Sequence, residues 1–93
     1  MLLGLIVNEL VTNAMKHAFP DDRRGCIRVR LEAHDNRLHL SVTDDGVGFD
    51  ISQRGSDRAQ GRELVKGLCD ELRGEMSVNS TATGSSFHVS IPT

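Results

Sequence analysis

The sequence predicts an α+β fold, a two-layer α/β sandwich in which a mostly antiparallel sheet is covered on one face by two helices. Apolar residues recur at helical spacing near the N-terminus and again after residue 60. Four shorter segments alternate apolar and polar residues, as half-buried strands do. The chain has 93 residues, of which 38% are hydrophobic, so residues 1–93 are expected to form one small domain.

The first helix is expected to run from Leu2 to about Ala18. An apolar stripe at helical spacing defines its buried side: Leu3, Ile6, Leu10, Ala14 and Ala18. Pro20 cannot continue a helix and disfavours helical geometry at Phe19, so the helix should end there.

Polar residues form a second stripe on this helix. Glu9, Asn13 and Lys16 lie at i, i+4 and i+7, with Asn8 and Thr12 beside them. Asn and Thr each cost about 0.5 kcal/mol of helix propensity relative to Ala, whereas a merely solvated face would favour Glu, Lys, Gln and Arg. Short amide and carboxylate groups on a rigid helix suit a metal ion or a phosphate. An ordinary solvated face is the alternative interpretation of this stretch alone.

Two strands are expected next. Residues 26–33 carry apolar side chains at every second position, which is the period of a half-buried strand. Residues 34–37 are expected to form a hairpin loop, and Leu38, Leu40 and Val42 continue the alternation in a partner strand. The first half of the chain therefore predicts a helix packed over an antiparallel pair of strands.

A glycine-containing loop follows the second strand. Gly46 and Gly48 let the backbone approach a flat or anionic ligand closely, and Asp44 at the strand end offers a fixed hydrogen-bond acceptor. Asp and Gly are also common turn residues, so a plain turn is the alternative. Residues 51–60 are polar and show neither period, and we interpret them as a mobile lid.

Gly61 is expected to open the second helix and Gly74 to end it. The buried side of this helix would carry Leu64, Val65, Leu68, Cys69 and Leu72. The free N–H groups and the dipole at its N-terminus would favour phosphate. Residues 75–79 and 85–91 are expected to form two further strands joined by a turn at residues 80–84.

Charge and composition exclude several classes of protein. A formal charge of −2 and a pI near 6.0 give no electrostatic case for nucleic acid. No apolar run reaches the roughly 18 residues of a membrane span, and the N-terminus lacks a secretory signal, so we expect a cytoplasmic piece without direct membrane contact. Because the chain opens inside a helical pattern, we expect it to be a fragment of a longer protein, in which a membrane anchor or a sensor would lie upstream.

The cysteines and most histidines show no pattern of a catalytic or metal site. Cys26 and Cys69 lack disulfide or zinc spacing, and both are assigned to packing as a reduced pair. No Ser-His-Asp or Cys-His arrangement stands out, and His34, His39 and His88 are interpreted as ordinary surface or strand histidines.

Three stretches in this order resemble the Bergerat-fold ATPases, the superfamily of gyrase, heat-shock chaperone, histidine kinase and mismatch-repair ATP-binding domains. Residues 8–17 (NELVTNAMKH) resemble the N box, residues 44–48 (DDGVG) the first glycine box, and residues 84–87 (GSSF) the closing Gly-Thr-x-Phe. The wording of the N box is close to that of the HWE and related sensor histidine kinases, which are bacterial. The resemblance covers nearly the whole chain and implies the Bergerat fold.

The resemblance implies roles for four residues of the N box. Asn13 corresponds to the metal-binding Asn, whose side-chain oxygen joins phosphate oxygens and water around Mg²⁺. Glu9 matches the position that acts as base in the ATP-hydrolysing relatives and could polarise an attacking imidazole in a kinase. Lys16 resembles the cation that contacts phosphate, with His17 beside it. Glu9 and Lys16 are therefore the expected catalytic residues, and Asn13, Lys16 and His17 would bind ATP and its metal.

The glycine boxes carry the other implied contacts. Asp44 matches the carboxylate that accepts a hydrogen bond from the adenine amino group, while Gly46 and Gly48 would pass under the base and form the lid hinge. Ser85 stands where the family usually has Thr, and its hydroxyl could keep a water-mediated link to adenine. Asp45 replaces the commoner Asn and is assigned mainly to the turn.

The second glycine box departs from the usual pattern, Gly-Leu-Gly-Leu-x-Leu-Val. Residues 59–65 read Ala-Gln-Gly-Arg-Glu-Leu-Val, so Gly61 is kept as an expected nucleotide contact and the first glycine is lost. That loss would reduce the freedom of the lid, and Arg62 would put a cation near the triphosphate. Arg54 and Arg58 in the lid are assigned to solvent, although one of them could swing onto a phosphate.

The resemblance thus implies the ATP-binding catalytic domain of a two-component sensor histidine kinase with ATP and Mg²⁺ as cofactors. The γ-phosphate would pass to a histidine on a separate dimerisation domain, and a response regulator would act downstream. Because dimerisation in this family comes from that upstream domain, residues 1–93 alone are expected to be monomeric. An anti-sigma-factor-like Ser/Thr protein kinase of the same fold is the enzymatic alternative. A degenerate docking domain that has lost ATP is the alternative from another class, motivated by the altered second glycine box.

Overall fold

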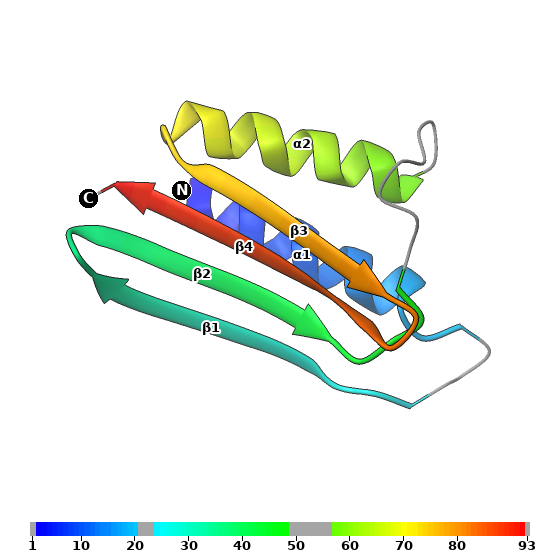
Figure 1. The fold of residues 1–93 in the computed structure, drawn as a ribbon. Helices are drawn as coiled ribbons and strands as arrows, with labels where there is room; N and C mark the ends of the chain where they lie inside the picture. Colours follow the sequence, from blue (N-terminus) through cyan, green and yellow to red (C-terminus); the bar gives the residue numbers. More distant parts are fainter. Residues whose placement is uncertain (1, 21–23, 49–56, 93) are drawn as a thin grey trace.

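The computed structural model describes residues 2–20, 24–48 and 57–92. In chain order the elements are α1 (Leu2–His17), β1 (Ile27–His34), β2 (Arg37–Asp44), α2 (Asp57–Glu71), β3 (Glu75–Thr81) and β4 (Gly84–Pro92). The strands form a sheet with the order β1-β2-β4-β3, and every neighbouring pair is antiparallel. Both helices lie on one face of this sheet (Figure 1). The predicted two-layer sandwich is therefore confirmed.

The core lies between the helices and the inner face of the two central strands. Its buried residues are Ile6, Leu10, Leu40, Val42, Val65, Cys69, Phe87, Val89 and Ile91. Each fully buried side chain of the size of Leu or Val contributes roughly 1.5–3 kcal/mol. Burial raises the pKa of the Cys69 thiol, which fits its predicted packing role. Cys26, in contrast, is exposed, so its assignment to packing is wrong.

The edge strand β1 differs from the half-buried strand that its alternation predicts. Val29 pairs with Val42 and Leu31 pairs with Leu40, so the alternating apolar residues of the two strands lie opposite one another. Val29 and Leu31 are nevertheless 46% and 56% exposed. The reason is that β1 is an edge strand in the strand order, whereas α1 packs on β2 and α2 packs on the opposite edge strand, β3 (Figure 1). Alternation defines a face of a strand, but it does not say what covers that face.

The hairpin between β1 and β2 is confirmed. Its two central residues, Asp35 and Asn36, have φ angles of 55° and 58°, and His34 pairs with Arg37. Two consecutive residues with positive φ are typical of the tight turns that match the right-handed twist of paired strands.

Helix α2 begins at Asp57, so the predicted start at Gly61 is wrong. Residues 57–60 of the predicted lid are helical, while residues 51–56 lie outside the described residues, together with the Arg54 and Arg58 side chains. This first turn was missed because it holds a single small apolar residue, Ala59, and so shows no apolar period. Neither helix, over the described residues, is long and apolar enough to cross a membrane.

The end of α2 is a Schellman motif. The amide of Gly74 donates to the carbonyl of Cys69 at 2.9 Å, and the amide of Arg73 donates to the carbonyl of Asp70 at 3.0 Å. The left-handed position of the motif belongs to Arg73, whose φ is 58°, and not to the predicted stop residue Gly74. A side chain in this conformation is held against its intrinsic preference.

Replacing Arg73 with glycine should stabilise the domain. Relief of the left-handed conformation, reduced by the greater entropy that glycine loses on folding, predicts a gain of about 0.5–1 kcal/mol in the free energy of unfolding. Urea denaturation of Arg73→Gly measures the gain, and Arg73→Ala is the control because alanine keeps the strained conformation. Equal stability of the two variants would contradict this account of the helix end.

Candidate functional site

The polar stripe of α1 faces the first part of α2 across a cavity of about 280 Å³. Its lining residues are Glu9, Asn13, Lys16, His17, Gln60, Gly61 and Leu64. All five residues that the sequence predicts in these two helices are therefore brought together. An ordinary solvated helix face would not be enclosed by a second helix.

Asn13 is the most deeply buried polar residue of this cavity. It is 5% exposed, and its Nδ2 atom has no hydrogen-bond partner within the described residues. The Nε2 atom of His17 is also buried and unpaired there. An unsatisfied buried polar atom costs about 1–3 kcal/mol, so a fold keeps such atoms mainly where a ligand or water completes them. Two of them in one cavity fit a ligand with oxygen acceptors, such as a phosphate.

Gly61 allows the close approach of α2 to the polar stripe. A Cβ atom at this position would lie 2.2 Å from Nδ2 of Asn13 and 2.7 Å from Oε1 of Glu9. Both distances are shorter than real Cβ contacts, so any side chain here would displace the two polar groups. Gly61 is the glycine that the altered second glycine box keeps. A side chain at this position would collide with Asn13 and Glu9, which line the cavity.

Asp44, the last residue of β2, has a carboxylate that is held by two hydrogen bonds. Its Oδ1 atom accepts from the amide of Gly46 at 3.0 Å, and its Oδ2 atom accepts from the hydroxyl of Ser85 at 2.6 Å. Ser85 is 5% exposed and pairs with Asp44 across the β2 and β4 strands. Each carboxylate oxygen can accept two hydrogen bonds, so both atoms keep capacity for a ligand.

The loop after Asp44 is packed against two other parts of the chain. The amide of Val47 donates to the carbonyl of Ala18 at 3.0 Å, next to the end of α1. A Cβ atom at Gly46 would lie 2.2 Å from that same carbonyl oxygen. Gly48 has a φ of 72°, and a Cβ there would lie 1.9 Å from the carbonyl oxygen of Thr81. The two predicted glycines are therefore required by close packing and, at Gly48, by a left-handed backbone.

The predicted site residues thus fall into two groups that meet at the C-terminal end of α1. One group surrounds the cavity between the helices, and the other consists of Asp44, Gly46, Gly48 and Ser85. Ala18 joins them because it follows His17 directly and accepts the hydrogen bond from the glycine loop. Arg62 is not among the described residues that line the cavity between the helices.

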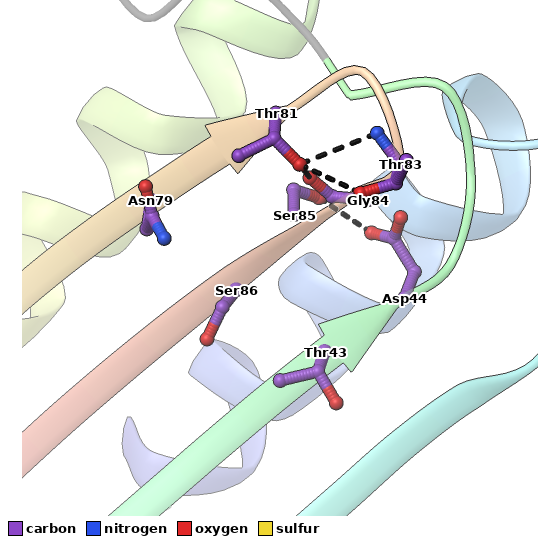
Figure 2. A pocket seen from close by; sticks show the side chains of 8 residues that line it. All are labelled: Thr43, Asp44, Asn79, Thr81, Thr83, Gly84, Ser85 and Ser86. Carbon is purple, nitrogen blue, oxygen red and sulfur yellow. Dashed lines mark hydrogen bonds between the residues drawn. The ribbon is translucent and has the colours of Figure 1, made fainter.

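A second cavity, of about 260 Å³, lies beside Asp44 at the end of the sheet (Figure 2). Small polar side chains line it: Thr43, Asp44, Asn79, Thr81, Thr83, Ser85 and Ser86, together with Gly84. Their hydroxyl groups are partly engaged with one another, since Thr81 Oγ1 lies 3.0 Å from Thr83 Oγ1 and accepts from the Thr83 amide at 3.2 Å. Thr43 and Ser86 alternate with the buried Val42 and Phe87, so the cavity extends onto the sheet face away from the helices.

Two features of the site region were not anticipated in the sequence. Asp45 bonds to Cys26 at the start of β1, although the sequence assigned it mainly to the turn. The strand histidines also form a row on the open sheet face: the ring centroids of His34 and His39 are 4.8 Å apart, and those of His39 and His88 are 5.6 Å apart. Their outward positions follow from alternation, but their proximity depends on the strand register.

Comparison with known proteins finds a match over residues 1–93 to the family model described as histidine kinase-, DNA gyrase B- and HSP90-like ATPase. Blue-light-activated histidine kinase 2 of Erythrobacter litoralis is 33% identical over 95 residues, which cover 97% of this chain and 27% of that protein. The serine-protein kinase RsbW of Bacillus licheniformis is 31% identical over 100 residues, which cover 91% of this chain and 62% of that protein.

The fold is also similar to solved structures. The histidine kinase domain of the Erythrobacter litoralis EL346 blue-light-activated histidine kinase superposes with a TM-score of 0.86 at 31% identity, over 98% of this chain and 46% of that one. The chain therefore spans about a quarter of the length of the curated histidine kinase it matches and under two thirds of that of RsbW.

Two glycines of α2 provide a matched test of the packing around the cavity. Gly67 is exposed and a Cβ there would meet nothing within 4 Å, so Gly67→Ala should raise the free energy of unfolding by about 0.5–1 kcal/mol through helix propensity. Gly61→Ala should lose this gain and be less stable than Gly67→Ala by at least about 1 kcal/mol, because its methyl group displaces Asn13. Urea denaturation measures both variants. An equal rise in both would show that Gly61 is not needed for close approach.

Proposed function

The chain belongs to the family of histidine kinase-, DNA gyrase B- and HSP90-like ATPases, and on this premise we propose that it is the ATP-binding catalytic domain of a two-component sensor histidine kinase. Domains of this family bind ATP. One observation carries the proposal: the Asp44 carboxylate, which accepts hydrogen bonds from Gly46 and Ser85, lies at the C-terminal end of α1, as does the cavity lined by Asn13. The similarity to a histidine kinase over 97% of the chain supports the choice within the family.

Asp44 would recognise the base. An ionised carboxylate only accepts hydrogen bonds, so it favours a partner with a donor, such as the amino group of adenine, over the carbonyl group of guanine. The bonds from Gly46 and Ser85 fix the carboxylate before the nucleotide arrives, which reduces the entropy lost on binding. Gly46 and Gly48 would let the backbone lie close to the base.

The cavity between the helices would hold the phosphates and a divalent cation. Asn13 has an amide oxygen that suits Mg²⁺, and its unpaired Nδ2 suits a phosphate oxygen. Lys16 and the Nε2 atom of His17 would contact phosphate oxygens from the same helix. Bound Mg²⁺ would supply charge neutralisation on the phosphates. Gly61 would keep α2 close enough to enclose them.

Catalysis would consist mainly of positioning and electrostatic stabilisation. Lys16 would offset the negative charge that develops on the transferred phosphoryl group, and Glu9 would polarise the attacking imidazole by accepting its proton. Bond formation to the imidazole nitrogen and loss of ADP complete the transfer. We further propose that the acceptor histidine belongs to a dimerisation domain outside this sequence, in the same chain or in a second one, and that a response regulator acts downstream.

A serine or threonine kinase is the second candidate. The similarity to the serine-protein kinase RsbW extends over 91% of this chain, at an identity close to that of the histidine kinase. The residues proposed to bind ATP would serve either acceptor, because they act on the nucleotide. The chemistry of the phosphorylated product separates the two candidates.

Nucleotide binding is the first test. Calorimetric titration with a non-hydrolysable ATP analogue should give binding that requires Mg²⁺, and Asn13→Asp and Asp44→Asn should each weaken it about tenfold or more. Asn13→Asp replaces the Nδ2 donor with a negative charge that repels the phosphates, and Asp44→Asn removes the charged acceptor for the adenine amino group. Glu71→Gln, an exposed change at the end of α2, is the control and should bind like the parent chain. No binding at millimolar nucleotide by a chain whose circular dichroism shows it to be folded would favour the docking-domain alternative.

Phosphotransfer is the second test. The chain alone should not incorporate label from [γ-³²P]ATP into its own four histidines, whereas a dimerisation domain of the histidine kinase type added in trans should become labelled. Acid treatment should release the label, because phosphohistidine is acid-labile and phosphoserine is not. An acid-stable product on a protein acceptor would support the RsbW-like alternative, and labelled histidine within residues 1–93 would contradict an external acceptor.

A further inference from the structure

Asp45 forms a two-bond link between the glycine loop and the residue before β1. Its backbone amide donates to the carbonyl of Cys26 at 3.3 Å, and its side-chain Oδ1 accepts from the amide of Cys26 at 2.8 Å. The first bond extends the β1–β2 pairing one residue beyond the Ile27 and Asp44 pair. The second bond is made by the side chain, so it depends on the residue type at position 45.

This link is next in the chain to one of the two groups that hold Asp44. Gly46 follows Asp45 in the chain and donates its amide to Oδ1 of Asp44 at 3.0 Å. A displacement of Asp45 therefore moves the amide of Gly46 relative to the carboxylate that it orients. The bond from Ser85 would remain, because it reaches the other carboxylate oxygen from β4.

The packing around Asp45 indicates a fitted arrangement. A Cβ atom at Gly25 would lie 2.0 Å from Cε1 of Phe19 and 2.6 Å from Oδ1 of Asp45. The Phe19 ring and the Asp45 carboxylate thus approach the backbone of Gly25 in space that a side chain would otherwise fill. Phe19, two residues after the end of α1, and the Asp45 carboxylate of the glycine loop thus both lie against the segment that precedes β1.

We propose that Asp45 is a positioning residue for base recognition: its carboxylate anchors the glycine loop to Cys26 and so keeps the Gly46 amide on the Asp44 carboxylate, which sets the preference for adenine. This rests on the proposed nucleotide site. The role requires a hydrogen-bond acceptor at position 45 and not a charge, so asparagine should fulfil it. Asp45 acts through Asp44 and has no contact of its own with the base.

Asp45→Ala and Asp45→Asn test this role, with Glu71→Ala as the control for loss of one exposed negative charge. Calorimetry with ADP and with GDP, each with Mg²⁺, gives the ratio of the two dissociation constants. Loss of a single solvent-accessible hydrogen bond predicts that Asp45→Ala weakens ADP binding by about threefold to tenfold. GDP binding should change less, so the preference for adenine falls. Asp45→Asn and Glu71→Ala should keep the ratio of the parent chain.

Amide hydrogen exchange by NMR gives a readout that does not depend on the ligand. Exchange at Cys26 and Gly46 should accelerate in Asp45→Ala while the amides of β4 keep their protection, which separates local release of the loop from general destabilisation. An unchanged ADP preference and unchanged Gly46 exchange in Asp45→Ala would overturn the proposal. A loss in Asp45→Asn as large as that in Asp45→Ala would also overturn it, because charge and not the acceptor would then matter. If the parent chain binds neither nucleotide, the proposed function fails, and the role of Asp45 in base recognition fails with it. If the parent chain binds ADP but Asp45→Ala keeps both the ADP preference and the Gly46 exchange rate, only the role of Asp45 is overturned.

Discussion

The arrangement of the site depends on how closely the loop after β2 approaches the C-terminal end of α1. The last carbonyl groups of a helix have no partner within it, and the carbonyl of Ala18 is satisfied here by the amide of Val47 at 3.0 Å. This contact leaves no space for a Cβ atom at Gly46. It also brings the carboxylate at the end of β2 to the helix that carries Asn13. The hydrogen bond from Val47 to Ala18 and the glycine at position 46 thus bring the Asp44 group and the Asn13 cavity of the proposed nucleotide site together.

Much of the fold could be predicted because periodicity reports which side of an element is buried. Ile6, Leu10 and Ala14 on α1 and Val65 and Cys69 on α2 are all buried, as their spacing predicts. Periodicity fails where a segment is too polar to show an apolar repeat, which is why the first turn of α2, with Ala59 as its one apolar residue, was missed. It also fails to say what covers a face: Val29 and Leu31 follow the same alternation as Leu40 and Val42 but lie on an edge strand that neither helix covers.

The sequence can single out a residue of the candidate site where one residue type has a single physical use at its position. Gly61 is such a case, because only glycine allows Asn13 and Glu9 to lie so close to α2. Asp45 is the opposite case. Aspartate is common in turns, so nothing local distinguishes a carboxylate that only shapes the turn from one that bonds to Cys26, 19 residues earlier in the chain. The row of His34, His39 and His88 depends in the same way on strand register, which a linear sequence does not display.

The proposed roles of the site residues would explain why one chain resembles two kinds of protein kinase. Phosphoryl transfer requires little covalent chemistry from the protein, so the residues around ATP mainly bind, orient and neutralise charge. Asp44 and Asn13 would act on the nucleotide, and neither distinguishes a histidine acceptor from a serine. The acceptor must then be selected by the protein that delivers it to the γ-phosphate. This chain is about equally similar to a histidine kinase and to a serine kinase, at 33% and 31% identity, and under the proposed function its acceptor would be decided by surfaces that the nucleotide does not touch.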